Sequence, residues 1–110
     1  MSGGVADPGV LVLGSLAGGP KHGWAVTEDV REAMGVTLGP GTLYGALARL
    51  EARGLVRALP SDERRKPYEL TAAGATALRE RAEAMREFSG TALRRLASGS
   101  SALDFSGGAV

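Results

Sequence analysis

Few side chains in this sequence have a chemistry that suits catalysis or metal binding. The 110 residues contain no cysteine and a single histidine, His22, which stands beside a glycine. Thiolate ligands and cysteine nucleophiles are therefore excluded, and one histidine builds neither a metal cluster nor a Ser–His–Asp set. The segment 18–23, GGPKHG, lacks the spacing of a phosphate-binding loop. We therefore expect no enzyme activity, no metal site and no cofactor.

The chemistry that remains is the binding of a polyanion. The formal net charge of +1 gives no indication of such a partner, but the charges are unevenly placed. Between residues 37 and 66, three acidic residues are outnumbered by the basic residues Arg49, Arg53, Arg57, Arg64, Arg65 and Lys66. A basic middle favours nucleic acid, but most charge clusters are only solvated surface, so this pattern leaves both interpretations open.

Turn and capping signals divide the chain into helices and one hairpin. Asp7-Pro8 and Gly39-Pro40 mark helix starts, and Gly35 and Gly54 mark helix ends. Helical spacing predicts one buried apolar stripe at Val26, Val30, Ala33 and Met34 and another at Leu43, Ala46, Leu47 and Leu50. The expected elements are a helix over 8–16, a helix over about 22–34, a helix over 40–53, a hairpin with strands 55–59 and 66–70, and a long helix over 72–97 capped by Thr71. Residues 36–38 are too few to assign, although they suit a minimal strand.

This order of elements predicts a mainly α fold with a small β-hairpin, an α+β winged helix-turn-helix with a long C-terminal dimerisation helix. The Gly-rich and Ser-rich ends bury too little apolar area to offset their ordering entropy. We expect a flexible N-terminal tail over 1–7, the winged helix-turn-helix DNA-binding domain over 8–71, the dimerisation helix over 72–97 and a flexible tail over 98–110.

The helix over 40–53 suits the role of a recognition helix. Such a helix enters the major groove led by its N-terminal residues, and its outer face must lack bulky acids. Here the outer face is small and mildly basic, Thr42 can donate to a phosphate or a base edge, and the basic hairpin tip supplies a wing. The predicted DNA-binding residues are Lys21, His22, Pro40, Gly41, Thr42, Tyr44, Arg49, Arg64, Arg65 and Lys66.

The last helix carries a short heptad seam. Its apolar and small residues step by four and three in alternation, and Phe88 and Leu93 widen the stripe. A stripe this wide favours a homodimer, although the helix could also pack back on its own domain. With one residue of the apolar first helix, the predicted dimerisation residues are Leu11, Leu78, Ala82, Met85, Phe88, Ala92 and Leu96.

Three strings of the sequence, VLGSLAGGPKHGWAV, PGTLYGALARLEARGLV and RRKPYELTAAGATAL, resemble the winged-helix domain of PadR-type transcriptional regulators. The resemblance runs from about Val10 to Leu78, and the short C-terminal part is similar to the small subfamily with a single dimerisation helix. It implies a homodimeric repressor that binds double-stranded DNA at a dyad-symmetric operator. It also implies that the C-terminal helix makes the dimer contacts and that the first helix packs against it.

Carried over by position, the resemblance places Thr42 and Tyr44 in the recognition helix and Arg64 to Lys66 in the wing. Gly39 stands where the family often has Ser, so a side-chain cap is lost. Trp24 stands where the family more often has Tyr, and we interpret it as a packing position. Many relatives release DNA on binding a small aromatic or drug-like effector, which would implicate Trp24, Met85 and Phe88 in a pocket unless they are simply core residues.

Two further expectations concern location and the alternative function. No apolar run approaches the roughly 20 residues of a membrane span, and residues 10–13 follow Asp7 and not a basic segment. We therefore expect a cytoplasmic protein without membrane association. The alternative to DNA binding is a winged-helix module for protein–protein interaction, which the small net charge keeps open.

Overall fold

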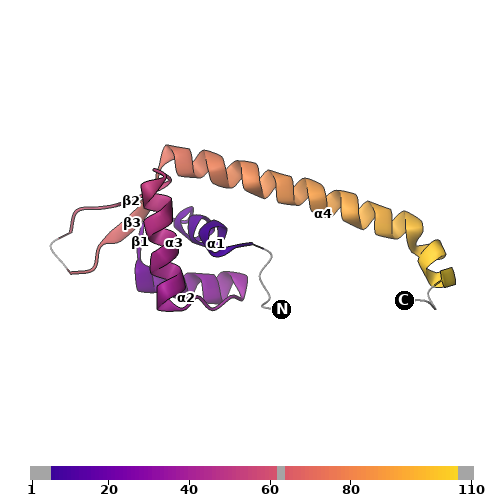
Figure 1. Ribbon diagram of the computed structural model, residues 1–110, viewed down its shortest axis with the longest axis horizontal. Helices are drawn as coiled ribbons and strands as arrows, with labels where there is room; N and C mark the ends of the chain where they lie inside the picture. Colours follow the sequence, from indigo (N-terminus) through magenta and orange to yellow (C-terminus); the bar gives the residue numbers. More distant parts are fainter. Residues whose placement is uncertain (1–5, 62–63, 107–110) are drawn as a thin grey trace. The chain divides into compact units, whose positions relative to one another are not determined.

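The computed structural model describes residues 6–61 and 64–106, with side chains as far as Gly99. In chain order the elements are α1 (Pro8–Leu16), β1 (Lys21–His22), α2 (Gly23–Met34), α3 (Pro40–Ala52), β2 (Val56–Ala58), β3 (Pro67–Leu70) and α4 (Ala72–Ser106) (Figure 1). Two compact units divide the chain, Met1–Arg79 and Glu80–Val110, and α4 continues from the first into the second. The helices and the small sheet confirm the predicted mainly α fold.

Helix α1 begins as its sequence predicts. The Asp7 carboxylate accepts a hydrogen bond from the Val10 backbone N–H at 2.9 Å. Pro8 fills the first turn, where its missing donor leaves no acceptor unsatisfied. The helix ends at Leu16, and Gly19, with φ 133°, takes the chain into β1.

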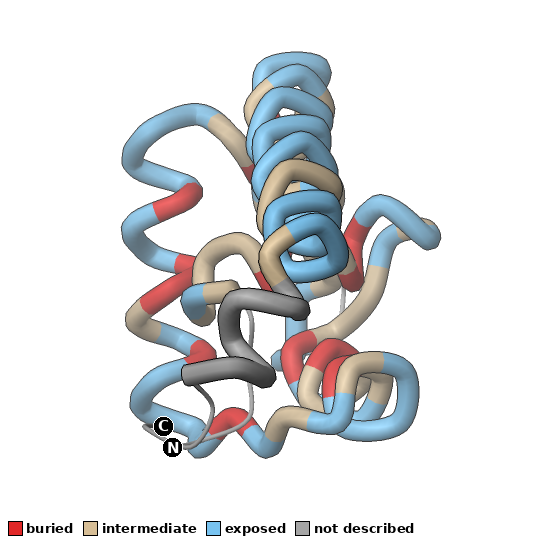
Figure 2. The backbone as a smooth tube through the Cα atoms, turned by 90° about the vertical axis from the view of Figure 1, so that its right-hand side faces the viewer, coloured by how far each residue is buried: buried red, intermediate tan, exposed pale blue. Residues whose placement is uncertain are grey.

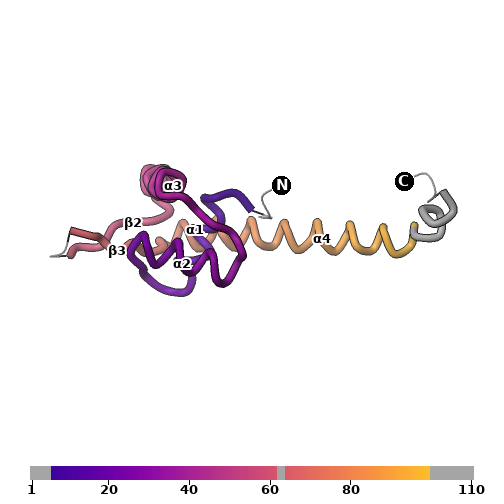
Figure 3. Tube along the Cα trace, turned by 90° about the horizontal axis from the view of Figure 1, so that it is seen from below, coloured from indigo at the N-terminus to yellow at the C-terminus, as the bar shows by residue number. Residues whose placement is uncertain are grey.

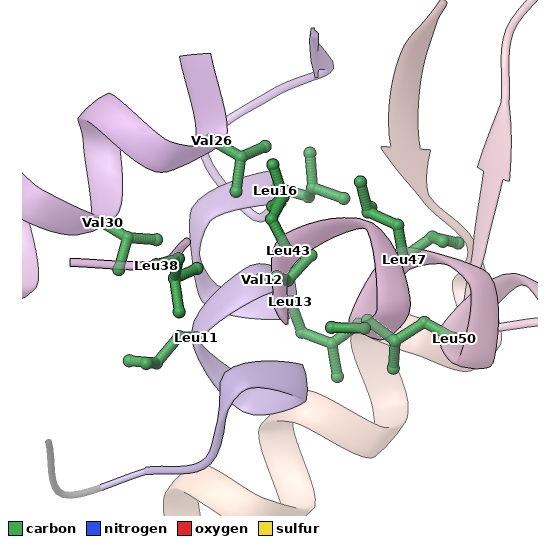
Figure 4. Close-up of a cluster of buried hydrophobic side chains, with 12 residues drawn as sticks. Leu11, Val12, Leu13, Leu16, Val26, Val30, Leu38, Leu43, Leu47 and Leu50 are labelled. Carbon is green, nitrogen blue, oxygen red and sulfur yellow. The ribbon is translucent and has the colours of Figure 1, made fainter. Parts of the chain in front are cut away.

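The core of the first unit lies where α1, α2 and α3 meet (Figure 4). Its buried side chains are Leu11, Val12, Leu13, Leu16, Val26, Val30, Leu38, Leu43, Ala46, Leu47, Leu50 and Val56. The apolar stripe predicted on α3 is confirmed, because Leu43, Ala46, Leu47 and Leu50 are all buried. Figure 2 shows buried segments in red alternating with exposed segments in pale blue along the backbone. On α2 the stripe holds at Val26 and Val30, but Ala33 is exposed and Met34 is only partly buried. Burial of a large aliphatic side chain contributes about 1.5–3 kcal/mol, so this cluster holds α3 in place.

Glycines end two of the helices, as predicted. Gly35 follows α2 with φ 71°, and Gly54 follows α3 with φ 76°. Both angles lie in the left-handed region, which glycine adopts without the steric cost that a Cβ brings. The turns they make start the connection to α3 and the approach to β2.

The sheet has one strand more than the predicted hairpin. Strands β2 and β3 pair antiparallel, with Arg57 opposite Glu69, as expected (Figure 3). The additional strand β1 pairs with the other edge of β3, with His22 opposite Pro67, which gives the order β1-β3-β2. A two-residue strand has no periodicity to detect, so no pattern in the sequence predicts it. Residues 36–38 belong to none of the described strands.

The start of α4 is fixed against the turn after α3. The Thr71 hydroxyl accepts from the Gly74 N–H at 3.0 Å and donates to the Gly54 carbonyl at 2.7 Å, which confirms Thr71 as the cap. A Cβ at Gly74 would collide with the Leu55 carbonyl oxygen. The Thr-x-x-Gly sequence therefore combines a cap with a close backbone approach.

The end of α4 differs from the prediction. The helix continues to Ser106, so the expected end near Ala97 is wrong. Gly and Ser lower helix propensity by about 1 kcal/mol or less per residue, and neither removes a backbone hydrogen bond as proline does. The predicted N-terminal tail and the last part of the C-terminal tail lie mostly outside the described residues.

Candidate nucleic-acid interface

The N-terminus of α3 presents backbone donors to the surface. Its cap position is Gly39, which makes no side-chain hydrogen bond to the helix, and Pro40, Gly41 and Thr42 are exposed. The Leu43 N–H already donates to the Gly39 carbonyl at 2.9 Å. The N–H groups of Gly41 and Thr42 precede the first intrahelical bond, and the first turn holds no acid to compete for them. This end of α3 therefore suits a phosphate.

The outer face of α3 is as small as predicted. Thr42, Ala48 and Arg49 are exposed, and Gly45 is partly exposed between them. Seven residues correspond to about two helical turns and about 10 Å, so Arg49 lies on the same side of α3 as Thr42. Arg49 also lines a hollow of ≈ 330 Å³ together with Asp7, Pro8, Gly9, Ala46, Leu50 and Arg53. It therefore stands beside the start of α1, at the far end of α3 from the open amides.

Tyr44 connects α3 with the beginning of α2. Its side chain is 50% exposed, yet a Cβ placed on Gly23 would lie only 2.5 Å from the Tyr44 hydroxyl oxygen and 2.8 Å from Cζ. The ring therefore covers Gly23, which explains why glycine is needed at this position. Burial raises the pKa of Tyr68, and the charges of Glu51 and of ionised Tyr44 raise it further.

The wing is basic at its tip, as predicted. Arg64, Arg65 and Lys66 are exposed and precede β3 directly. Further down the hairpin, Arg57 pairs with Glu69 across the two strands at 2.6 Å. That carboxylate offsets the Arg57 charge, so the tip holds the cations that a phosphate would meet.

Trp24 lies at the surface beside the wing arginines and not in the core. It is 55% exposed, so our interpretation of it as a packing position is wrong. It lines a hollow of ≈ 490 Å³ together with His22, Arg64 and Arg65. The strand that the sequence did not reveal explains this neighbourhood, because β1 holds His22 opposite Pro67, the residue that follows the wing tip.

Lys21 is placed differently from the other predicted DNA-binding cations. Its ammonium group donates to the carbonyl oxygens of Ser15 and Gly19, at the C-terminal end of α1. A cation there satisfies open carbonyls and interacts favourably with the helix dipole. The Ser15 side chain is buried and donates to Asp29 at 2.7 Å, a polar contact that the sequence did not indicate. Lys21 thus caps a helix, and a contact between Lys21 and DNA stays a prediction.

The predicted dimerisation residues fall into two groups. In the first unit, Leu11 is only 7% exposed, and it lines an apolar hollow of ≈ 400 Å³ with Ala6, Val10, Gly14, Met34, Val36 and Leu78. In the second unit, Met85 and Ala92 are partly buried and Ala82 is exposed. Phe88, Leu93 and Leu96 are exposed by 73%, 66% and 55%. Both units therefore leave apolar surface open to solvent.

The three core helices, the small sheet and the open N-terminus of α3 define a winged helix-turn-helix, an arrangement of DNA-binding domains. Comparison with known proteins agrees with this class. The family model of the transcriptional regulator PadR-like family matches residues 12–80. This chain therefore belongs to the PadR-like family of transcriptional regulators, which are DNA-binding regulators and not enzymes.

Solved structures and one curated sequence extend the comparison. A PadR family transcription regulator from hypervirulent Clostridium difficile R20291 is 28% identical, with a TM-score of 0.73 over 81% of this chain and 97% of that one. A PadR family transcriptional regulator from Eggerthella lenta is 29% identical, with a TM-score of 0.64 over 80% and 81% of the two chains. An uncharacterised 37.1 kDa protein in transposon TN4556 of Streptomyces fradiae is 49% identical over 84 residues, which are 76% of this chain and 24% of that protein. The chain thus spans about a quarter of the length of the curated relative it matches.

None of the helices among the described residues is both long and apolar enough to cross a bilayer.

Proposed function

We propose that this protein is a homodimeric repressor that binds a pseudo-palindromic operator through α3 and the wing. The observation that carries the proposal is the N-terminus of α3, which has no side-chain cap and no acid in its first turn. The outer face of α3 is small, and the wing tip adds exposed cations to this surface. A surface of this kind supplies phosphate contacts for position and leaves room for base edges to be read. Residues 8–71 then form the DNA-binding domain, and α4 (Ala72–Ser106) supplies the dimerisation helix.

Within this proposal, α3 enters the major groove by its first turn. Gly41 and Thr42 face a phosphate or a base edge, and the small Gly45 and Ala48 let the backbone approach the groove floor. Two copies related by a dyad place their α3 helices in half-sites about one helical turn, or about 10 base pairs, apart or a multiple of that distance. Repression follows where such a site overlaps a promoter.

Fluorescence anisotropy with randomised and then selected duplexes, across a salt series, tests DNA binding. We expect saturable, steeply salt-dependent binding of two chains to one dyad-symmetric duplex. A folded dimer that binds no duplex even at low salt would overturn the proposal and favour the alternative of a protein-interaction module.

The role of Thr42 can be separated into base reading and backbone contact. Thr42→Val keeps the shape of the side chain and removes its hydroxyl group. If Thr42 reads a base edge, the preferred operator sequence changes at one position per half-site. If the hydroxyl meets a phosphate, affinity falls on every sequence alike, which would contradict base reading by this residue.

Dimerisation is supported by apolar surface that a single chain leaves uncovered. Phe88 and Leu93 expose most of their side chains, and an exposed aromatic of this size suits an interface better than solvent. We expect the double substitution of Phe88→Ala and Leu93→Ala to weaken the dimer, measured by sedimentation velocity over a dilution series. Glu87→Ala is the matched control, because Glu87 is an exposed neighbour outside the apolar stripe. Equal dimer dissociation constants for the double variant and the control would refute this part.

Release of DNA by a small aromatic or drug-like effector is the last part of the proposal. Of its predicted pocket residues, Trp24 lines a hollow with two arginines, which suits an anion better than a neutral drug. A ligand that binds the folded protein raises its melting temperature by mass action. A panel of aromatic acids and neutral aromatics, tested by thermal shift and then for release of bound duplex, decides between effector control and its absence.

A further inference from the structure

The exposure of Trp24 calls for an explanation, because large aromatic side chains are normally well buried. The indole is 55% exposed, and it is the only tryptophan in the chain. Its neighbours Gly23 and Val26 are buried, so the segment itself is firmly held while the indole faces outward. An exposed, well-supported tryptophan of this kind is typical of a contact residue.

The hollow beside Trp24 is suited to an anion. Among the described residues, those that line it are His22, Trp24, Arg64 and Arg65, none of which carries a carboxylate. Helix α2 begins here, at Gly23, without a side-chain cap and without an acid in its first turn. The positive end of the helix dipole therefore adds to the two guanidinium charges. One guanidinium group can donate two parallel N–H hydrogen bonds to phosphate oxygens, which makes the interaction directional as well as electrostatic.

The hollow is continuous with the proposed DNA-binding surface on two sides. On one side, Tyr44 of α3 covers Gly23, the residue next to Trp24. On the other side, Arg64 and Arg65 belong to the wing, which β1 joins through the pairing of His22 with Pro67. A duplex that met both α3 and the wing would bring its backbone over this hollow.

We infer that the hollow holds a phosphate of the operator backbone and that Trp24 contacts DNA. Arg64 and Arg65 bind the phosphate oxygens, and the indole packs against the adjoining deoxyribose or donates its N–H to the same phosphate. This inference rests on the proposed function and adds a contact that the recognition helix and the wing do not make by themselves. The contact carries no sequence information, because every phosphate is alike.

The experiment uses Trp24 as its own reporter. The intact protein is titrated with its selected duplex, and tryptophan emission and its quenching by acrylamide are recorded while a labelled duplex reports affinity by anisotropy. We expect the duplex to shield Trp24 from acrylamide at the same stoichiometry at which anisotropy saturates. Trp24→Ala should weaken binding about tenfold on selected and random duplexes alike, as expected for the loss of one contact to a charged group.

Two controls accompany this titration. Trp24→Phe keeps a ring against the sugar and should retain part of the affinity, and thermal melting of both variants checks that the fold is intact. Arg31→Ala removes one positive charge at the other end of α2, where Arg31 is paired with Glu28, and should cost less affinity than Arg65→Ala.

The outcomes separate this inference from the proposed function. If the protein binds duplex while Trp24 stays equally accessible and Trp24→Ala binds like wild type, the inference is overturned and the proposed function stands. If no duplex binds, both are overturned. Equal shielding by inorganic phosphate alone would replace the operator backbone with a small-anion site, and shielding by polyglutamate but not by DNA would point to an acidic protein partner. Either result would overturn the inference.

Discussion

Removal of the wing-tip arginines should change how DNA binding responds to salt. In the double variant Arg64→Ala and Arg65→Ala, each chain loses two exposed guanidinium groups, so the proposed dimer loses four charges. Each phosphate contact contributes about −0.9 to the slope of log K against log salt, so the slope should become less negative by about 3.6. Between about 50 and 200 mM salt, the factor by which affinity falls should therefore be on the order of 100 times smaller for the variant than for wild type.

The assay is anisotropy of a labelled, selected duplex at several salt concentrations, with the dimer confirmed at each one. The matched control is the double variant Arg31→Ala and Arg57→Ala, which removes the same number of charges from the same unit. Those arginines are already paired with Glu28 and Glu69, so their loss should change the slope much less. An unchanged slope in the wing-tip variant, or an equal change in both variants, would refute the contact between wing and phosphate.

Three further predictions test the packing around this surface. Gly23→Ala should push the Tyr44 ring aside, because the new Cβ would lie 2.5 Å from its hydroxyl oxygen, and duplex affinity should fall more than the melting temperature does; retained affinity would contradict the role of Tyr44. Gly74→Ala drives a methyl group into a backbone carbonyl and should lower the free energy of unfolding by about 1–3 kcal/mol in urea titrations, whereas Gly99→Ala, with open space around its Cβ, should not destabilise the protein. Because burial raises the pKa of Tyr68 above its ordinary 10.0, its contribution to stability is complete below pH 10 and falls as the pH rises through the folded-state pKa; Tyr68→Phe should flatten that alkaline loss in melting experiments.

The elements whose signals are local could be predicted from the sequence. The cap at Asp7, the glycines after α2 and α3, and the cap at Thr71 depend on residues a few positions apart, and the structure places each of them as predicted. The buried stripe of α3 follows from helical periodicity, which is also local. The family could be named from short strings for the same reason, because they encode these caps and stripes.

The sequence was less informative where a residue's role depends on a distant neighbour. Charge alone groups Lys21 with the DNA-binding cations, but its ammonium group caps the C-terminal end of α1, a contact that forms only when the chain folds back. The Ser and Gly residues after Ala97 predict too early an end for α4, because they weaken a helix without removing its hydrogen bonds.

The sequence by itself determined the class of fold, the helix α3 with its small outer face and the basic hairpin tip, since spacing and capping depend on residues close together in the chain. Tertiary structure alone decided that β1 joins the sheet and that Trp24 faces outward beside the wing arginines. A strand of two residues is stable only when a partner strand supplies its hydrogen bonds, and that partner lies more than forty residues further along the chain. The hollow that suits a phosphate depends on this pairing, so no local sequence pattern predicts it.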